Sequence, residues 1–114
     1  ELNFYRNVGT TKNPSFELVS DRFADIDVGR RSFPTFADIN ADGKYELFIG
    51  SETGKILMYR EENSKEEVSF KHDPAFSLSL NNYATPSLVD INADGKLDVI
   101  SGSISGGLIF YYGR

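Results

Sequence analysis

Two short acidic segments of this chain carry oxygen-bearing side chains at alternate positions. Residues 38–46 read DINADGKYE and residues 90–98 read DINADGKLD, so the second segment repeats the first almost letter for letter at an offset of 52 residues, from 38 to 90. Alternate side chains of a tight loop converge on one point, and Ca²⁺ takes about six to eight oxygen ligands at roughly 2.3–2.6 Å. The spacing therefore predicts one Ca²⁺ site in each segment.

Each predicted site uses five positions of its segment. Positions one, three, five and nine supply side-chain oxygens, and position seven supplies a backbone carbonyl oxygen. The predicted ligands are Asp38, Asn40, Asp42, Lys44 and Glu46 in the first site, and Asp90, Asn92, Asp94, Lys96 and Asp98 in the second. Gly43 and Gly95 hold position six, where the chain turns sharply and a positive φ favours glycine. We therefore expect two Ca²⁺ ions, each with a structural role.

An EF-hand does not fit these segments. It needs a bidentate Glu at position twelve, which is Ile49 in one copy and Ser101 in the other. The flanking residues 33–37 (FPTFA) and 45–49 (YELFI) are rich in the aromatic and β-branched types that strands favour. A polar hairpin turn without a metal is the other interpretation, because Asp, Asn and Gly are common in turns. The second copy in register, with an acid at position nine, favours the metal site.

The charge of the chain agrees with local ion sites. The formal net charge is −5, and six of the 17 acidic residues are predicted ligands. Nucleic acid is not an expected partner, because the sequence has no concentrated basic stretch. The absence of Cys excludes thiolate metal sites and disulfides. A transmembrane helix needs an apolar run of about 18 residues. The sequence contains no such run, so we expect no membrane insertion.

The pattern around the two segments resembles the FG-GAP and VCBS-type repeats. It reads Pro-x-x-x-Asp-x-Asn-x-Asp-Gly-x-x-Asp/Glu-Leu/Val-x-x-Gly and is followed by Gly-x-Ile/Leu-x-x-Tyr. The resemblance covers essentially the whole chain and implies blades of a calcium-binding β-propeller, as in the integrin α-subunit head. That family usually has Asp at position nine, so Glu46 implies a different coordination geometry or affinity in the first site.

The predicted fold is all-β, with two tandem four-stranded antiparallel propeller blades. A first repeat spans about 7–60 and a second spans 61–112, while residues 1–6 are the remnant of a preceding blade's last strand. Strands are expected at 15–19, 33–38, 45–49 and 55–60, and again at 68–71, 85–90, 97–100 and 108–112. The apolar residues on both faces of these strands suit sheets packed on both sides. Residues 52–54 are the predicted turn between the second and third strands.

Two blades cannot close a ring, since propellers typically have four to eight. We therefore expect the chain to be a piece of a longer polypeptide or to assemble from several copies. Its expected partners are adjoining blades or further copies of the chain. The edge strands would otherwise be open to aggregation.

The predicted function is binding rather than catalysis. A propeller segment of this type implies an extracellular or cell-surface protein of the adhesion type that binds a protein or a glycan. The loops at the end opposite the acidic segments are the candidate binding surface, and they contain Arg30, Arg31, Glu52, Thr53, Asn81, Asn82, Tyr83 and Ser105. The alternative is part of a calcium-dependent polysaccharide lyase or hydrolase, but no isolated, apolar-flanked carboxyl group indicates a proton donor.

Overall fold

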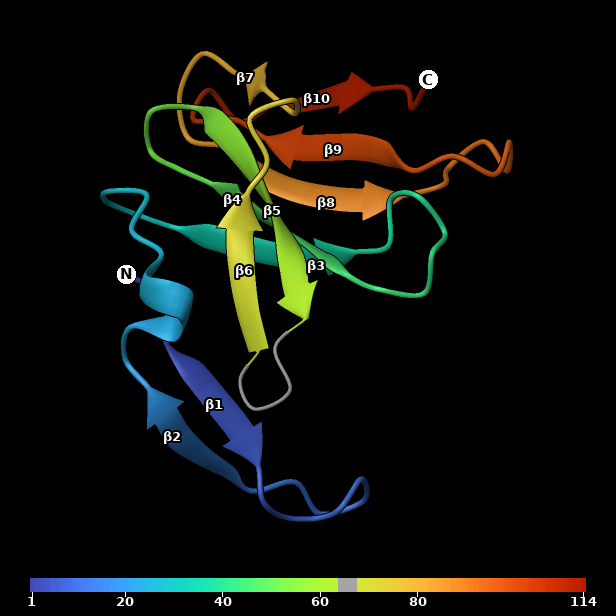
Figure 1. The fold of residues 1–114 in the computed structure, drawn as a ribbon. Coiled ribbons are helices and arrows are strands. Elements are labelled where there is room, and N and C mark those ends of the chain that lie inside the picture. Colours follow the sequence, from blue (N-terminus) through green and yellow to red (C-terminus); the bar gives the residue numbers. More distant parts are fainter. Residues whose placement is uncertain (64–67) are drawn as a thin grey trace.

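The computed structural model describes residues 1–63 and 68–114, and it is built from antiparallel strands (Figure 1). The strands are β1 (Phe4–Asn7), β2 (Phe16–Ser20), β3 (Phe33–Ala37), β4 (Glu46–Gly50), β5 (Lys55–Asn63), β6 (Val68–His72), β7 (Leu78–Ser79), β8 (Thr85–Val89), β9 (Asp98–Gly102) and β10 (Leu108–Tyr111). A short 3-10 helix, η1, spans Phe23–Asp25. The prediction of an all-β fold is confirmed. Within the described residues, no helix is long and apolar enough to cross a membrane.

The strands form three sheets. Strands β1 and β2 form one sheet, and β8, β9 and β10 form another with β9 in the middle. The largest sheet has the order β3-β4-β5-β6, and β7 pairs with the start of β5. We expected two four-stranded sheets. In the described part of the chain only the β3-β4-β5-β6 order has four strands, and the other two sheets have two and three strands. The sheets are also staggered against the predicted repeats, because β6 lies in repeat 61–112 and pairs with β5 of repeat 7–60.

The two repeated segments fold into the same hairpin. In the first copy Phe33 pairs with Gly50 and Ala37 pairs with Glu46. In the second copy Thr85 pairs with Gly102 and Val89 pairs with Asp98, which is the same register at an offset of 52 residues. Each acidic segment is therefore the loop between two antiparallel strands, as the flanking strand-forming residues predicted.

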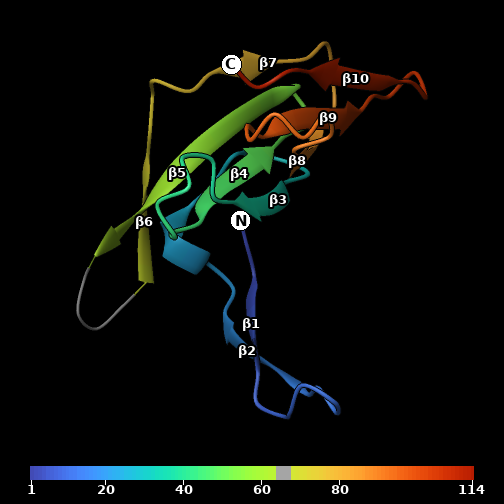
Figure 2. The same ribbon diagram turned by 90° about the vertical axis from the view of Figure 1, so that its right-hand side faces the viewer.

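Strand β4 lies at the centre of the structure and is buried along its whole length. On one face, Phe48 packs with Ala84 and Val99 and so joins the β8–β10 sheet to the largest sheet. On the other face, Leu47 and Ile49 pack with residues near the N-terminus and around η1. The expectation of a sheet packed on both sides is confirmed for β4, and Figure 2 shows β8 and β9 beside β3 and β4.

The hairpin of β1 and β2 projects away from the two larger sheets (Figures 1 and 2). Its apolar side chains are largely exposed, including Phe16 at 66% and Leu18 at 50%. The connection from β4 to β5 is a tight turn in which Gly54 donates to the carbonyl of Ser51 and has a φ of 84°. The predicted turn at 52–54 is therefore confirmed.

Candidate metal centre

The two acidic loops have the same backbone conformation. Gly43 and Gly95 both have a φ of 85°, as their place at position six predicted. Ala41 and Ala93 both have a φ of 58°, a left-handed conformation that costs a non-glycine residue free energy. The two copies of the repeated sequence therefore adopt one loop geometry between strands of the same register.

In the first loop, the side chains at positions one, three and five fold back over the loop's own backbone. Asp38 accepts a hydrogen bond from the N–H of Asp42 with Oδ1 (3.1 Å) and from the N–H of Gly43 with Oδ2 (2.9 Å). The Oδ1 of Asn40 accepts from the same Asp42 N–H at 3.2 Å. The oxygens at positions one and three therefore approach one point, and Asp42 Oδ1 accepts from the N–H of Lys44 at 2.8 Å.

The second loop repeats these contacts. Asp90 accepts from the N–H groups of Asp94 (3.1 Å) and Gly95 (2.9 Å), and Asn92 Oδ1 accepts from Asp94 at 3.1 Å. Asp94 Oδ1 accepts from the N–H of Lys96 at 2.9 Å. The structure thus brings the side-chain oxygens of positions one and three to one N–H in both loops, and in the second loop Asn92 Nδ2 also donates to Asp94 Oδ2 at 3.1 Å.

The acid at position nine makes different hydrogen bonds from those of positions one, three and five. Glu46 is the first residue of β4, and it is only 3% exposed. Its Oε2 accepts from the N–H of Ile39 at 3.0 Å, and its Oε1 accepts from Arg60 Nη1 at 3.2 Å. Glu46 therefore joins the start of the acidic loop to β5.

Asp98 makes the equivalent bond to the loop in the second copy, but its second partner is different. It is 0% exposed, its Oδ2 accepts from the N–H of Ile91 at 3.0 Å, and its Oδ1 accepts from the N–H of Gly113 at 2.8 Å. Sequence reasoning treated Glu46 and Asp98 as ligands alone and missed this anchoring role. This role could have been predicted from their position, because each is the first residue of a strand whose following residues are apolar on both faces.

The donor set of each loop suits a hard cation, because it consists of carboxylate, amide and carbonyl oxygens. Among the residues that the structure describes, no three acidic or histidine side chains come close enough together to form a metal-binding cluster by themselves. The residues that would hold Ca²⁺ are those that the spacing predicts, at positions one, three, five and nine with the carbonyl of position seven. A carboxylate oxygen accepts more than one partner, so the loop hydrogen bonds leave acceptor capacity at Asp38 and Asp42, and likewise at Asp90 and Asp94.

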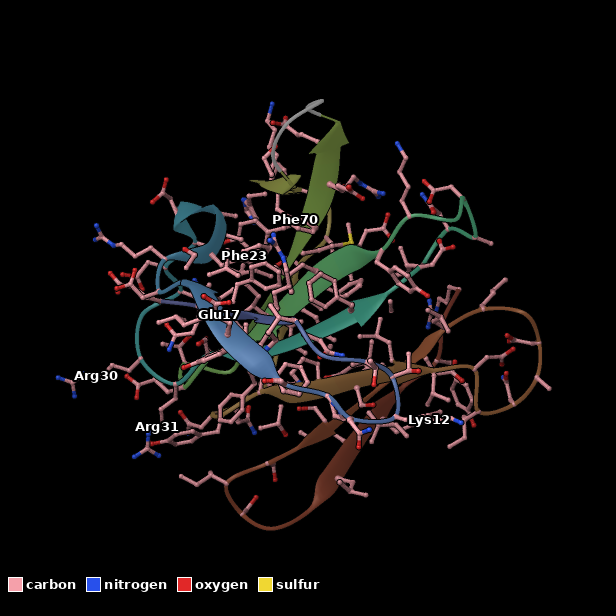
Figure 3. All side chains as sticks on the ribbon, turned by 90° about the horizontal axis from the view of Figure 1, so that it is seen from below. Lys12, Glu17, Phe23, Arg30, Arg31 and Phe70 are labelled. Atoms are coloured by element: carbon pink, nitrogen blue, oxygen red, sulfur yellow. The ribbon has the colours of Figure 1, made fainter. Side chains whose placement is uncertain are left out.

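The candidate binding loops meet at the opposite end of the same hairpins. The carbonyl of Arg30 accepts from the N–H of Glu52 at 3.4 Å, and the carbonyl of Glu52 accepts from the N–H of Tyr83 at 3.1 Å. The Arg31 guanidinium lies 5.1 Å from the centre of the Tyr83 ring, beside a cavity of about 290 Å³ that both residues line with Ser103. Figure 3 shows Arg30 and Arg31 pointing outward from this edge of the molecule.

A comparison with known protein families matches the region that contains the two acidic loops. A family model described as an FG-GAP-like repeat matches residues 38–101. No curated protein and no solved structure matches the chain. The matched region runs from the first acidic loop into β9 and covers more than half of the 114 residues. The chain therefore belongs to the FG-GAP-like repeat family.

Proposed function

We propose that this chain is a calcium-binding segment of a β-propeller in an extracellular or cell-surface protein, and that it binds a protein or glycan ligand. The observation that carries the proposal is the pair of loops with the same sequence, the same backbone angles and the same carboxylate contacts. The β3–β6 sheet and the β8–β10 sheet, which pack against each other, are two blades in this proposal.

Calcium has a structural role in this proposal. Each loop gathers two aspartates and the oxygen of an asparagine around one turn, and their like charges repel one another without a cation. A bound ion offsets this repulsion and stabilises the folded state, by about 2.7 kcal/mol per site at a hundredfold excess over Kd. The ion fixes the loop and takes no part in a reaction.

The extracellular setting is part of the proposal and is supported by the family resemblance and by the affinity expected of such loops. Calcium loops in extracellular modules bind with Kd values of about 10⁻⁴–10⁻³ M, which is useful where calcium is abundant. The exposed loops and their few charged ligands agree with weak binding of this kind.

A binding role is supported by the surface opposite the acidic loops. Within the described residues, no carboxylate lies within ion-pair distance of Arg30 or Arg31. Arginine and tyrosine are enriched where proteins recognise ligands. A screen of glycans and matrix proteins, with Arg31→Ala and Tyr83→Ala as loss-of-binding variants and Lys12→Ala as the control, tests this role. Cleavage of an acidic polysaccharide would instead support the enzymatic alternative.

The metal proposal is tested by counting sites. Isothermal titration of the chain with Ca²⁺ should give two sites. Asp42→Ala and Asp94→Ala should each leave one site, and the double variant should leave none. Two sites that persist in the double variant would refute the assignment of these loops.

A further inference from the structure

Strands β3 and β8 occupy the same position in the two repeats, but one of their faces differs in burial. This face is covered in β8 and exposed to solvent in β3. Pro86 and Leu88 of β8 correspond to Pro34 and Phe36 of β3 at the repeat offset of 52 residues. Pro86 is buried and Leu88 packs against the core around Phe48. Pro34 is exposed, and Phe36 is 52% exposed. A surface that is an interface in the second copy is therefore uncovered in the first.

Strand β4 packs over this face of β8, and the close contact requires glycine at position 50. A Cβ built at Gly50 would lie 2.6 Å from the Cδ of Pro86, closer than real Cβ atoms approach other atoms. It would also collide with the carbonyl oxygen of Ala84. Glycine at the end of β4 is what allows the two sheets to approach this closely.

The uncovered face of β3 borders an apolar cavity of about 340 Å³. Its lining includes Leu2, Phe4, Phe23, Pro34, Phe36 and Leu47. Phe23 lies 5.2 Å from Phe4 and 5.8 Å from Phe70 between ring centres, and Figure 3 shows Phe23 and Phe70 side by side. The cavity lies on the opposite side of β4 from β8, because it contacts Leu47 whereas Phe48 packs toward β8.

Strand β1 also lacks a neighbour that its copy has. Residues 2–6 correspond to 56–60 in β5, and β5 has β4 on one edge and β6 on the other. Strand β1 has β2 in the place of β6, and the described residues place no strand on its other edge. The β1–β2 hairpin is therefore the outer half of a sheet whose inner half is missing beside the open face of β3.

We propose that this face receives the inner strand pair of another FG-GAP-like repeat, which pairs with the free edge of β1 and lays a glycine against Pro34. The inference rests on the proposed propeller arrangement and names its partner surface. A second copy of this chain fits less well than a separate strand pair. Strand β10 corresponds to β1, so docking the β8–β10 sheet here would bring two copies of one strand to the same position.

The sequence offers a direct test. Glu1 corresponds to Lys55, so a duplicate of residues 31–54 joined directly to Glu1 would place a copy of β3 and β4 ahead of β1 in the natural register. The extended chain should melt at a higher temperature than the original chain. Backbone amides of β1 should exchange with solvent roughly tenfold more slowly or better, because a new strand pairs with them.

The matched control is the same extension with Gly50→Val in the duplicate alone. Its added Cβ should prevent contact with Pro34, so the melting temperature and β1 exchange should return to those of the original chain. An extension that leaves both measurements unchanged, or a valine variant that is equally protected, would overturn the inference. So would an unextended chain that forms oligomers dispersed by Phe36→Asp and not by Val8→Asp, because a second copy would then fill this face.

The outcome is separable from that of the metal proposal. Calcium binding to the unextended chain is measured independently. If calcium binds but the added strands stay unprotected, the docking surface is refuted and the metal sites stand. If the added strands are protected but calcium does not bind, the metal sites are refuted and the docking surface stands.

Discussion

Asp98, which is fully buried at the start of β9, accepts a hydrogen bond at 2.8 Å from the backbone N–H of Gly113, fifteen residues later in the sequence. Its other carboxylate oxygen accepts from Ile91 in the acidic loop at 3.0 Å. One side chain therefore connects the loop, β9 and the segment after β10. Glu46 makes the corresponding connection in the first copy, through Ile39 and Arg60.

This relationship predicts that Asp98 stabilises the fold without calcium. In excess chelator, Asp98→Ala should lower the free energy of unfolding by about 2–4 kcal/mol, because it leaves two backbone N–H groups without their acceptor. Asp94→Ala should lower it by less than about 1 kcal/mol, because Asp94 is exposed and its backbone partners can bond to water. Urea unfolding of both variants measures the difference, and equal losses in chelator would contradict a separate structural role for Asp98.

The two equivalent glycines at the ends of β4 and β9 should respond differently to alanine. Gly50→Ala should destabilise the chain by about 1–3 kcal/mol, because its Cβ meets the backbone of Ala84 and the ring of Pro86. Gly102→Ala should cost less, since the one described atom within 4 Å of its Cβ is Thr85 Oγ1 at 2.8 Å, and moving this side chain loses only the hydrogen bond that it accepts from the Gly102 N–H. Thermal melting compares the two variants, and a larger loss for Gly102→Ala would contradict the packing described for β4 and β8.

The ion pair between Arg60 and Asp73 predicts a loss of stability in acid. Arg60 Nε donates to Asp73 Oδ2 at 2.7 Å, and this bond, with a second from the backbone N–H of Ala75, lowers the pKa of Asp73 from its ordinary value of 3.8. The folded state then binds the Asp73 proton more weakly than the unfolded state does. The stabilisation is present above about pH 4 and is lost as the pH falls through the lowered pKa.

Asp73→Asn should therefore reduce stability at pH 7 and weaken its dependence on pH below about 4. The effect should be modest and should shrink in high salt, because the Arg60 side chain is 44% exposed. Asp21→Asn is the control, since Asp21 is exposed and has no described ion pair. Unfolding curves across the acid range test the prediction, which fails if Asp73→Asn and the control have the same pH dependence as the original chain.

The sequence predicted the local structure well because most strands and loops occur twice, so the residue pattern of one copy can be compared with that of the other. Strands expected at 33–38 and 85–90 are observed as Phe33–Ala37 and Thr85–Val89. The loop positions that require left-handed glycine were also predicted, since Gly43 and Gly95 occur at the same place in both copies. Local turn chemistry is specified by a few adjacent residues, so it can be read from them directly.

The pairing of the outer strands could not be predicted in the same way. Strands β2 and β6 each follow the strand that they pair with, whereas the predicted repeats grouped each of them with the strands after it. Both assignments satisfy the same alternation of side chains. The choice depends on contacts between distant segments, such as the packing of Phe70 against Phe23, which a single strand's sequence does not specify.

The role of the ninth-position acid was missed for a related reason. Spacing along the loop assigns Glu46 and Asp98 to the ion, but their burial depends on the neighbouring third strand and on residues after it. The partners also differ, since an arginine side chain serves one copy and a backbone N–H serves the other. No pattern within the nine-residue segment encodes these partners.

The most direct test of the account is the melting temperature of the chain in calcium and in chelator. With calcium at a hundredfold excess over Kd, each occupied loop contributes about 2.7 kcal/mol, so two loops should raise the midpoint by roughly 20 °C. The double variant Asp42→Ala, Asp94→Ala should be folded and should show no rise, and magnesium at the same concentration should have a smaller effect on the original chain. A folded original chain whose midpoint is the same in calcium and in chelator would contradict the central claim that these two loops bind calcium.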